Sequence, residues 1–327
     1  MVRKIMVVVA LLALIIVIAV FRNPLLRQPA QLPEVPPAVG KDEIKVIILG
    51  TGSPLNNPLR SKPSQVVLAG GKYFLVDCGG GTVSRLQEAG IPLEKIEDVF
   101  FTHQHSDHDS GFIDFFISSW DSPTGPRNKP LKVYGPPTTK EVIGVMRQSL
   151  DYDISVRQDH IPRSSEGLNI EYTEMSEGVI YNDGQVKVTV FPVEHSPVKD
   201  AVGYRFEYKG KLVVFSGDTG PCENIVKYGR DADLLVHEAY SKEWMEAARQ
   251  KFPEKANLVD NVVKYHSSTL EVADEAQRAG VKHVVLTHLM PAPSPVWYWE
   301  QYFIKGMRGI YNGKISVGRD LMTFSLE

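Results

Sequence analysis

Cysteine is scarce in this sequence: Cys78 and Cys222 are the only two among 327 residues. A framework of several disulfides is therefore excluded, and two free thiols are the simpler interpretation, although one bridge between them stays open. Solenoid-scale repeats are also absent. With 43% hydrophobic and 23% charged residues, the composition excludes a fibrous or disordered chain and predicts one large globular domain.

The chain also lacks an excess of basic residues, since 36 Lys and Arg stand against 39 Asp and Glu. When the four basic residues of positions 1–27 are set aside, 32 remain against 39 acidic residues, a net charge of −7. Such a charge argues against a nucleic-acid groove. We therefore expect a small-molecule substrate and no nucleic-acid partner. The sequence leaves open whether the protein forms a homodimer.

The one long hydrophobic run lies at the N-terminus, at residues 5–21, where seventeen apolar residues follow Arg3 and Lys4 and precede Arg22. This length is short for a membrane span and long for the apolar part of a cleaved signal peptide, so both interpretations stand. The run is not followed by a small-x-small cleavage site. We predict that residues 1–22 are a signal anchor, or transmembrane helix, and that the catalytic domain is membrane-anchored and extracytoplasmic, periplasmic or at the cell surface.

Prolines crowd the next stretch, which cannot be helical or join a sheet interior. Residues 23–42 are therefore predicted to be a Pro-rich tether, and residues 43–327 the catalytic domain. Within this domain short β-branched runs alternate with Gly, Pro and Asp, which is typical of strands. Strands are predicted at residues 45–49, 65–68, 73–76, 98–102, 131–134, 186–191, 202–208, 211–215, 234–236 and 283–286.

Helices are predicted between these strands, from the glycines at 79–81 through Leu86 and near residues 111–119 and 269–279. Strand-rich halves with interspersed helices favour an α+β fold in which two sheets pack together with helices outside, an αββα sandwich. Chemically suggestive residues stand at predicted strand ends, where loops on one rim can converge on a single site. They are His103, His195, Asp218, Glu238 and His288.

The sequence His103-Gln104-His105-Ser106-Asp107-His108 places four good metal ligands in six positions. One ion cannot comfortably use all four, whereas two can. Imidazole and carboxylate ligands suit zinc, and Mn²⁺ or Fe²⁺ is not excluded. Two ions also need further ligands, for which the strand-end residues are candidates, and a carboxylate such as Asp218 could bridge them. Two such ions make a metal-bound hydroxide available at neutral pH for attack on phosphorus or sulfur.

These residues together resemble the metallo-β-lactamase superfamily over residues 44–327. Three further motifs resemble its ribonuclease Z and arylsulfatase-like, or phosphodiesterase, branch. They are Leu-Gly-Thr-Gly-Ser-Pro at 49–54, Val-Asp-Cys-Gly at 76–79, and the pair His-Glu-Ala at 237–239 with His-Ser-Ser-Thr at 266–269. The resemblance implies the metallo-β-lactamase fold and one zinc on His103, His105 and His195. It implies a second zinc on Asp107, His108 and His288, with Asp218 bridging.

By the same resemblance Asp107, Glu238 and His266 act in catalysis, with Glu238 and His266 as a pair that handles protons. The alternative for that pair is a buried salt bridge. The chain departs from ribonuclease Z in having Ser106 where glycine is usual, and it shows no Gly-Pro-rich arm with clustered Lys and Arg. We therefore expect a dinuclear zinc hydrolase of phosphodiester or sulfate esters.

Three other functions stay open. One is a ribonuclease Z-type tRNA 3′-processing endonuclease, and another is a lactonase or β-lactamase-type hydrolase. The third is a catalytically silent binding module that keeps its metals for structure. The aromatic segment at residues 290–299, directly behind His288, is expected either to line the substrate pocket or to anchor a C-terminal helix or meet a membrane surface.

Overall fold

The computed structural model describes residues 40, 42–122 and 125–327. The predicted membrane segment, residues 1–22, and nearly all of the predicted tether lie outside the described residues. Within the described part of the chain, none of the helices combines the length and the apolar character needed to cross a bilayer. Both cysteines are free thiols, Cys78 buried and Cys222 half-buried.

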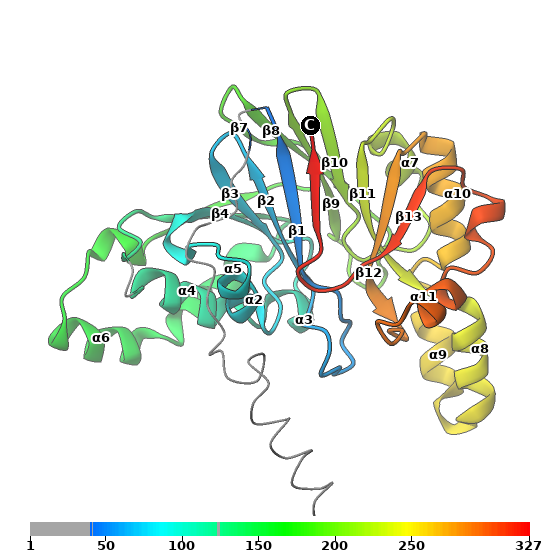
Figure 1. The fold of residues 1–327 in the computed structure, drawn as a ribbon. Helices are drawn as coiled ribbons and strands as arrows, with labels where there is room; N and C mark the ends of the chain where they lie inside the picture. Colours follow the sequence, from blue (N-terminus) through cyan, green and yellow to red (C-terminus); the bar gives the residue numbers. More distant parts are fainter. Residues whose placement is uncertain (1–39, 41, 123–124) are drawn as a thin grey trace, which may run out of the picture.

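Two mixed sheets of seven strands each form the centre of the molecule (Figure 1). The first has the order β14-β1-β2-β3-β4-β5-β6 and the second the order β13-β12-β11-β10-β9-β8-β7. The first sheet consists of β1 (Ile44–Gly50), β2 (Ser64–Ala69), β3 (Lys72–Val76), β4 (Ile96–Phe100), β5 (Leu131–Gly135), β6 (Ile170–Glu174) and β14 (Thr323–Leu326). The second consists of β7 (Gly178–Asn182), β8 (Val186–Pro192), β9 (Val202–Tyr208), β10 (Lys211–Phe215), β11 (Leu234–Tyr240), β12 (His283–Met290) and β13 (Lys314–Val317).

Alternation along the strands divides the apolar residues between two faces of each sheet. In β1, Val46 and Ile48 join the core between the sheets, where they meet Val188 and Phe206 of the second sheet. The intervening Ile47 belongs instead to the core beneath the helices that cover the first sheet. The predicted αββα sandwich is therefore the observed arrangement.

Helices cover the outer face of each sheet (Figure 1). Those packed on the first sheet are α2 (Thr82–Glu88), α4 (Phe112–Trp120), α5 (Thr139–Gln148) and α6 (Asp151–His160). Those packed on the second are α7 (Glu223–Tyr228), α10 (Thr269–Ala279) and α11 (Trp297–Phe303). The short α3 (Ser106–Asp109) lies near the edge where the sheets meet, and α8 (Lys242–Lys251) and α9 (Ala256–Val262) project together from the second half. Four 3₁₀ turns complete the described elements: η2 (Leu93–Lys95), η3 (Ser165–Leu168), η4 (Pro253–Lys255) and η5 (Met307–Gly309).

The strand boundaries correct the sequence prediction at the functional edge. Strand β4 ends at Phe100, two residues before the predicted end. Strands β11 and β12 run on together to Tyr240 and Met290, because they pair in parallel beyond the predicted ends. Glu238 and His288 therefore lie within strands and not after them.

Candidate metal centre

The seven predicted metal ligands come together at one edge of the sandwich. Ring nitrogens and carboxylate oxygens of His103, His105, His195 and Asp218 lie within 4.8 Å of one another. A second group, Asp107, His108 and His288, meets the same limit. Six of these side chains are buried, and only His105 is exposed. The sequence separates these residues by up to 185 positions, and the convergence of β4, β8, β10 and β12 at this edge brings them together.

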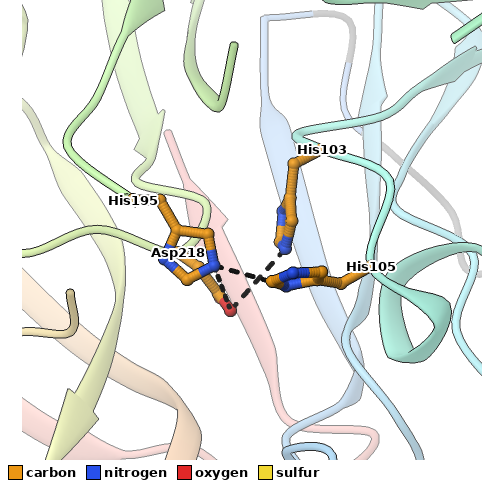
Figure 2. Close-up of side chains that lie close together, drawn as sticks. All are labelled: His103, His105, His195 and Asp218. Carbon is orange, nitrogen blue, oxygen red and sulfur yellow. Dashed lines mark hydrogen bonds and ion pairs between the residues drawn. The ribbon is translucent and has the colours of Figure 1, made fainter. Parts of the chain in front are cut away.

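In the first group, four side chains from three segments of the chain point toward a common centre, with His103 and His105 on the same segment (Figure 2). Nε2 of His195 lies 3.3 Å from Nδ1 of His105. Nε2 of His103 and Nε2 of His195 each lie 3.9 Å from Oδ2 of Asp218. Three ring nitrogens and one carboxylate oxygen thus face one small volume, which is the donor arrangement that a divalent ion requires.

Asp218 also faces the second group. Its Oδ1 lies 3.4 Å from Nε2 of His108, and its Oδ2 lies 3.2 Å from Nε2 of His288. Asp107 completes the group, with Oδ2 at 3.3 Å from His288 Nε2 and 3.6 Å from His108 Nε2. The carboxylate of Asp218 therefore lies between the two groups, where one side chain could serve two ions.

A β-bulge directs His288 toward this centre. Glu238 pairs with Thr287 and Ala239 pairs with Leu289, so His288 is the extra residue in β12. Its φ is +43°, in the left-handed region that a non-glycine residue rarely adopts. Bulges of this kind re-aim a side chain next to active sites. Nothing in the sequence marks this bulge.

Asp77 supports the centre from behind and was not among the predicted site residues. Its Oδ2 lies 2.8 Å from Nδ1 of His108, and its two oxygens accept hydrogen bonds from the backbone N–H and hydroxyl of Thr102. The Thr102 hydroxyl in turn lies 3.1 Å from Nδ1 of His103. Partners of this kind fix the ring orientation of metal-binding histidines. The Val-Asp-Cys-Gly motif was the available signal, and it was used only to identify the branch.

Glu238 and His266 form the predicted pair beside the second group. Nδ1 of His266 lies 2.7 Å from Oε1 of Glu238, and that oxygen also accepts hydrogen bonds from the N–H groups of Thr219 and Ser267. Both side chains are buried. The His266 ring stacks at 5.4 Å on that of His288, and His266 also forms a third close group with Asp218 and His288. The pair therefore adjoins the centre, and His266 is itself within reach of it.

Burial and neighbouring charges set the ionisation of these groups. Burial lowers the pKa of His103 well below its ordinary value, and burial also lowers the pKa of His105 and of His195. Burial would likewise lower the pKa of His266, but the carboxylate of Glu238 outweighs it and raises that pKa to about 9. Neutral imidazoles offer lone pairs to a metal, whereas a protonated imidazole can donate a proton.

Buried nitrogens without partners fit a metal at this centre. Among the described residues, Nε2 of His103 and Nε2 of His108 have no hydrogen-bond partner, and both atoms face Asp218. A buried polar atom without a partner costs free energy unless something else satisfies it. Imidazole and carboxylate donors suit zinc, manganese or iron, so the donor set fits two divalent ions.

The chain resembles known proteins in both sequence and fold. Residues 72–289 match the model of the family described as "Beta-lactamase superfamily domain". The ribonuclease Z of Mycolicibacterium gilvum (strain PYR-GCK) is 35% identical over 278 residues, which cover 85% of this chain and 94% of that protein. Among solved structures, the metallo-beta-lactamase fold protein YhfI from Bacillus subtilis has a TM-score of 0.66 at 20% identity and covers 87% of this chain and 100% of its own. Human tRNase Z, short form, has a TM-score of 0.63 at 21% identity and covers 86% of this chain and 99% of its own.

The relatives correct two predictions. The sequence predicts no nucleic-acid partner, and this prediction is wrong, because the relatives carry the name of a ribonuclease. The net charge misled because it sums over the whole chain and does not report the charge around one site. The prediction of a membrane-anchored, extracytoplasmic hydrolase is contradicted as well, by relatives that carry the name ribonuclease Z. The localisation rested on an apolar run at the lower limit of a membrane span, and that run lies outside the described residues.

Proposed function

The chain belongs to the beta-lactamase superfamily, as a metal-dependent hydrolase with ribonuclease Z relatives, and on that premise we propose that it is an endonuclease that cleaves RNA at the 3′ side of tRNA precursors. The observation that carries the proposal is the position of the Glu238–His266 pair against the metal centre. Hydrolysis of RNA must expel a ribose alkoxide, a poor leaving group that needs a proton. A protonated imidazole beside the centre meets that need.

We assign one ion to His103, His105 and His195, a second to Asp107, His108 and His288, and the bridging role to Asp218. When bound, two divalent ions would activate water and stabilise the negative charge that develops on the phosphate oxygens. Zinc is the metal we expect, since nitrogen donors outnumber oxygen donors.

The remaining steps belong to the protein's own side chains. Glu238 accepts a hydrogen bond from Nδ1 of His266 and so leaves Nε2 as the nitrogen that faces the centre. The backbone N–H groups of Thr219 and Ser267 hold the same Glu238 oxygen in place. His266 is thus oriented to give its Nε2 proton to the departing oxygen.

A transfer RNA precursor with a 3′ trailer is the substrate for the test. Metal-loaded protein should release the trailer by a single cut, and Asp218→Ala should abolish the cut. Asp114→Ala, which alters an exposed carboxylate on α4, is the matched control and should cleave normally. Turnover of aryl phosphodiesters without cleavage of any RNA would overturn the proposal.

A small phosphodiester is the second candidate substrate. The hollow lined by Arg60, Lys62 and Arg85 has a volume of about 560 Å³, which is the size of a small-ligand pocket. Lys62 and Asp107 both pack against Gly79, so this cation lies close to the second metal group. No feature of the described residues favours sulfate esters in the same way. The predicted activity on sulfate esters therefore has no support.

A further inference from the structure

Large aromatic side chains stand exposed just behind the metal centre. Trp297, Tyr298 and Trp299 at the start of α11 are 70%, 61% and 45% exposed, and Tyr302, one turn later, is 39% exposed. Isolated exposed apolar residues are ordinary, but a contiguous group of this kind marks a binding surface. These four residues are called the aromatic platform below.

The platform is held rigidly from beneath. Phe303 is fully buried in the core of the second half, and Trp244 of α8 packs edge-on against Trp299 at 6.1 Å and stacks on Tyr302 at 6.0 Å. The preceding loop is tied down where Arg60 donates a hydrogen bond of 3.1 Å to the carbonyl of Pro293. Trp299 and Tyr302 are therefore supported by Trp244 and still partly exposed, so little ordering of these two rings is needed when a ligand binds.

The platform follows the candidate metal centre closely along the chain. Strand β12 carries His288 and ends at Met290, and the loop from Met290 leads directly into α11. The carbonyl of Met290 accepts a hydrogen bond from the N–H of Ser241, so α8 begins at the same edge. Figure 1 shows α8, α9 and α11 extending on the side of the sandwich where α3 lies.

On the platform's own segment the exposed charges are positive, whereas α8, which packs against the platform through Trp244, carries exposed Lys242 and Glu243. Within residues 291–311, all of which the structure describes, the exposed charged side chains are Lys305 and Arg308. The single acidic residue, Glu300, is buried and ion-paired with Arg319 at 2.6 Å. The ammonium of Lys305 lies 5.8 Å from the ring centroid of Tyr302. Flat aromatic faces beside cations, on a chain of net charge −3, complement a ligand with stackable rings and negative charge.

We propose that the aromatic platform stacks the single-stranded nucleotides of RNA that flank the scissile phosphate. This inference rests on the proposed function and names the part of the substrate that the chain grips. Bases stack on Trp and Tyr with little sequence preference, and neighbouring Lys and Arg meet the phosphates. The sequence shows no basic arm for binding RNA. The platform would then provide an RNA-binding surface that does not depend on such an arm. A second copy of the chain and a lipid surface are the competing occupants.

The test compares Trp297→Ala/Trp299→Ala with the wild type, both metal-loaded. Anisotropy of a labelled oligouridine, shown by gel to stay intact, measures binding. Each stacked base lost should weaken binding at least about fivefold, so the double variant should bind about 25-fold more weakly. Metal content and turnover of bis(p-nitrophenyl) phosphate should not change, because neither side chain contacts the proposed ligands. Tyr152→Ala is the matched control, since Tyr152 on α6 is 82% exposed and lies on the other half of the molecule.

Equal RNA affinity in the double variant and the wild type would overturn the inference. So would an unchanged RNA affinity combined with loss of a dimer in sedimentation, or with loss of binding to anionic phospholipid vesicles. These outcomes are separable from failure of the proposed function. If the wild type binds oligouridine through the two tryptophans but cuts no tRNA precursor, the endonuclease proposal fails and the platform stands. If it cuts the precursor and the double variant binds as well as the wild type, the platform alone fails.

Discussion

Asp77 lies 2.8 Å from Nδ1 of His108, on the side of the ring opposite to the nitrogen that faces Asp218. Asp77 itself has φ of +54°, a left-handed conformation that is uncommon outside glycine, asparagine and aspartate. The backbone N–H of Thr102 also donates a hydrogen bond to this carboxylate. Asp77, which directly follows β3, therefore links the orientation of the His108 ring to the backbone segment that carries His103. The centre therefore depends on a residue that contacts neither proposed ion.

The first prediction concerns this support. Asp77→Asn should lower metal affinity about 10- to 100-fold, because the amide cannot hold the His108 ring as the carboxylate does. Competition with a chromogenic chelator measures the affinity directly. Asp98→Asn is the control, since Asp98 is equally buried but bonds Tyr134 away from the centre. An Asp77 variant that binds metal as tightly as the wild type would show that the contact is only structural.

The second prediction concerns Asp218. Wild-type protein should carry about two metal equivalents per chain, and Asp218→Ala should lose at least one of them, because this carboxylate faces both groups. Elemental analysis after gel filtration gives the count. Circular dichroism should show a folded variant. Full metal content in Asp218→Ala would remove the bridging assignment, and an active wild type without bound transition metal would remove the centre.

Much of the fold could be predicted because local and global signals agree. Alternation located β9 and β10 with their observed ends, and α10 spans the predicted residues 269–279. Helix α10 begins with a capping box of Ser268 and Glu271 and ends at Gly280, which has a φ of +68°. Residues next to each end therefore determine both boundaries of the helix. The close spacing of His103 and its neighbours identified the metal centre for the same reason.

The features of the fold and site that could not be predicted from the sequence depend on contacts between distant segments of the chain. The bulge at His288 exists only because β12 pairs with β11, and the support from Asp77 requires β3 to lie beside β4. Helices α8 and α9 lie in a polar stretch between β11 and α10, and their bounds were not predicted. The aromatic segment was interpreted in two ways because exposure cannot be read from composition. Trp299 and Tyr302 prove to be exposed, whereas Phe303 is the anchor in the core.

The third prediction concerns pH and stability. His283, at the start of β12, is half-buried with Nε2 at 2.9 Å from the hydroxyl of Ser316, and burial together with Lys314 lowers its pKa to about 4. The unfolded chain binds a proton at His283 more readily than the folded chain does. The contribution of His283 to the free energy of unfolding is therefore complete above about pH 6.5 and is lost as pH falls toward 4. After allowance for partial exposure, the loss should be about 1 kcal/mol.

Urea unfolding of metal-loaded protein between pH 7 and pH 4.5 measures this effect. His283→Gln should reduce the fall in the free energy of unfolding between pH 7 and pH 4.5. His160→Gln, at an exposed position on α6, should leave that fall unchanged. The difference between the two variants isolates His283 from the histidines of the metal centre. Parallel curves for both variants would mean that His283 does not contribute.

The last prediction concerns His266. Because its Nδ1 is held by Glu238 at 2.7 Å, the ring is placed to protonate a leaving group. His266→Ala should keep near-normal metal content and slow turnover by about 10²-fold or more for alkoxide leaving groups, but much less for a nitrophenolate, which departs unaided. Glu238→Gln should give the same pattern more weakly. Steady-state rates on a series of phosphodiesters with graded leaving groups provide the measurement.

Two other results would change the assignment of His266. Its ring belongs to a close group with Asp218 and His288, so a metal could reach it. If His266→Ala releases one ion, the residue is a ligand and the role of His288 must be revised. If turnover falls equally for every leaving group while both ions remain, His266 positions the substrate and does not donate the proton. Only a loss that grows with the basicity of the leaving group is consistent with proton donation, because only then does the missing proton limit the rate.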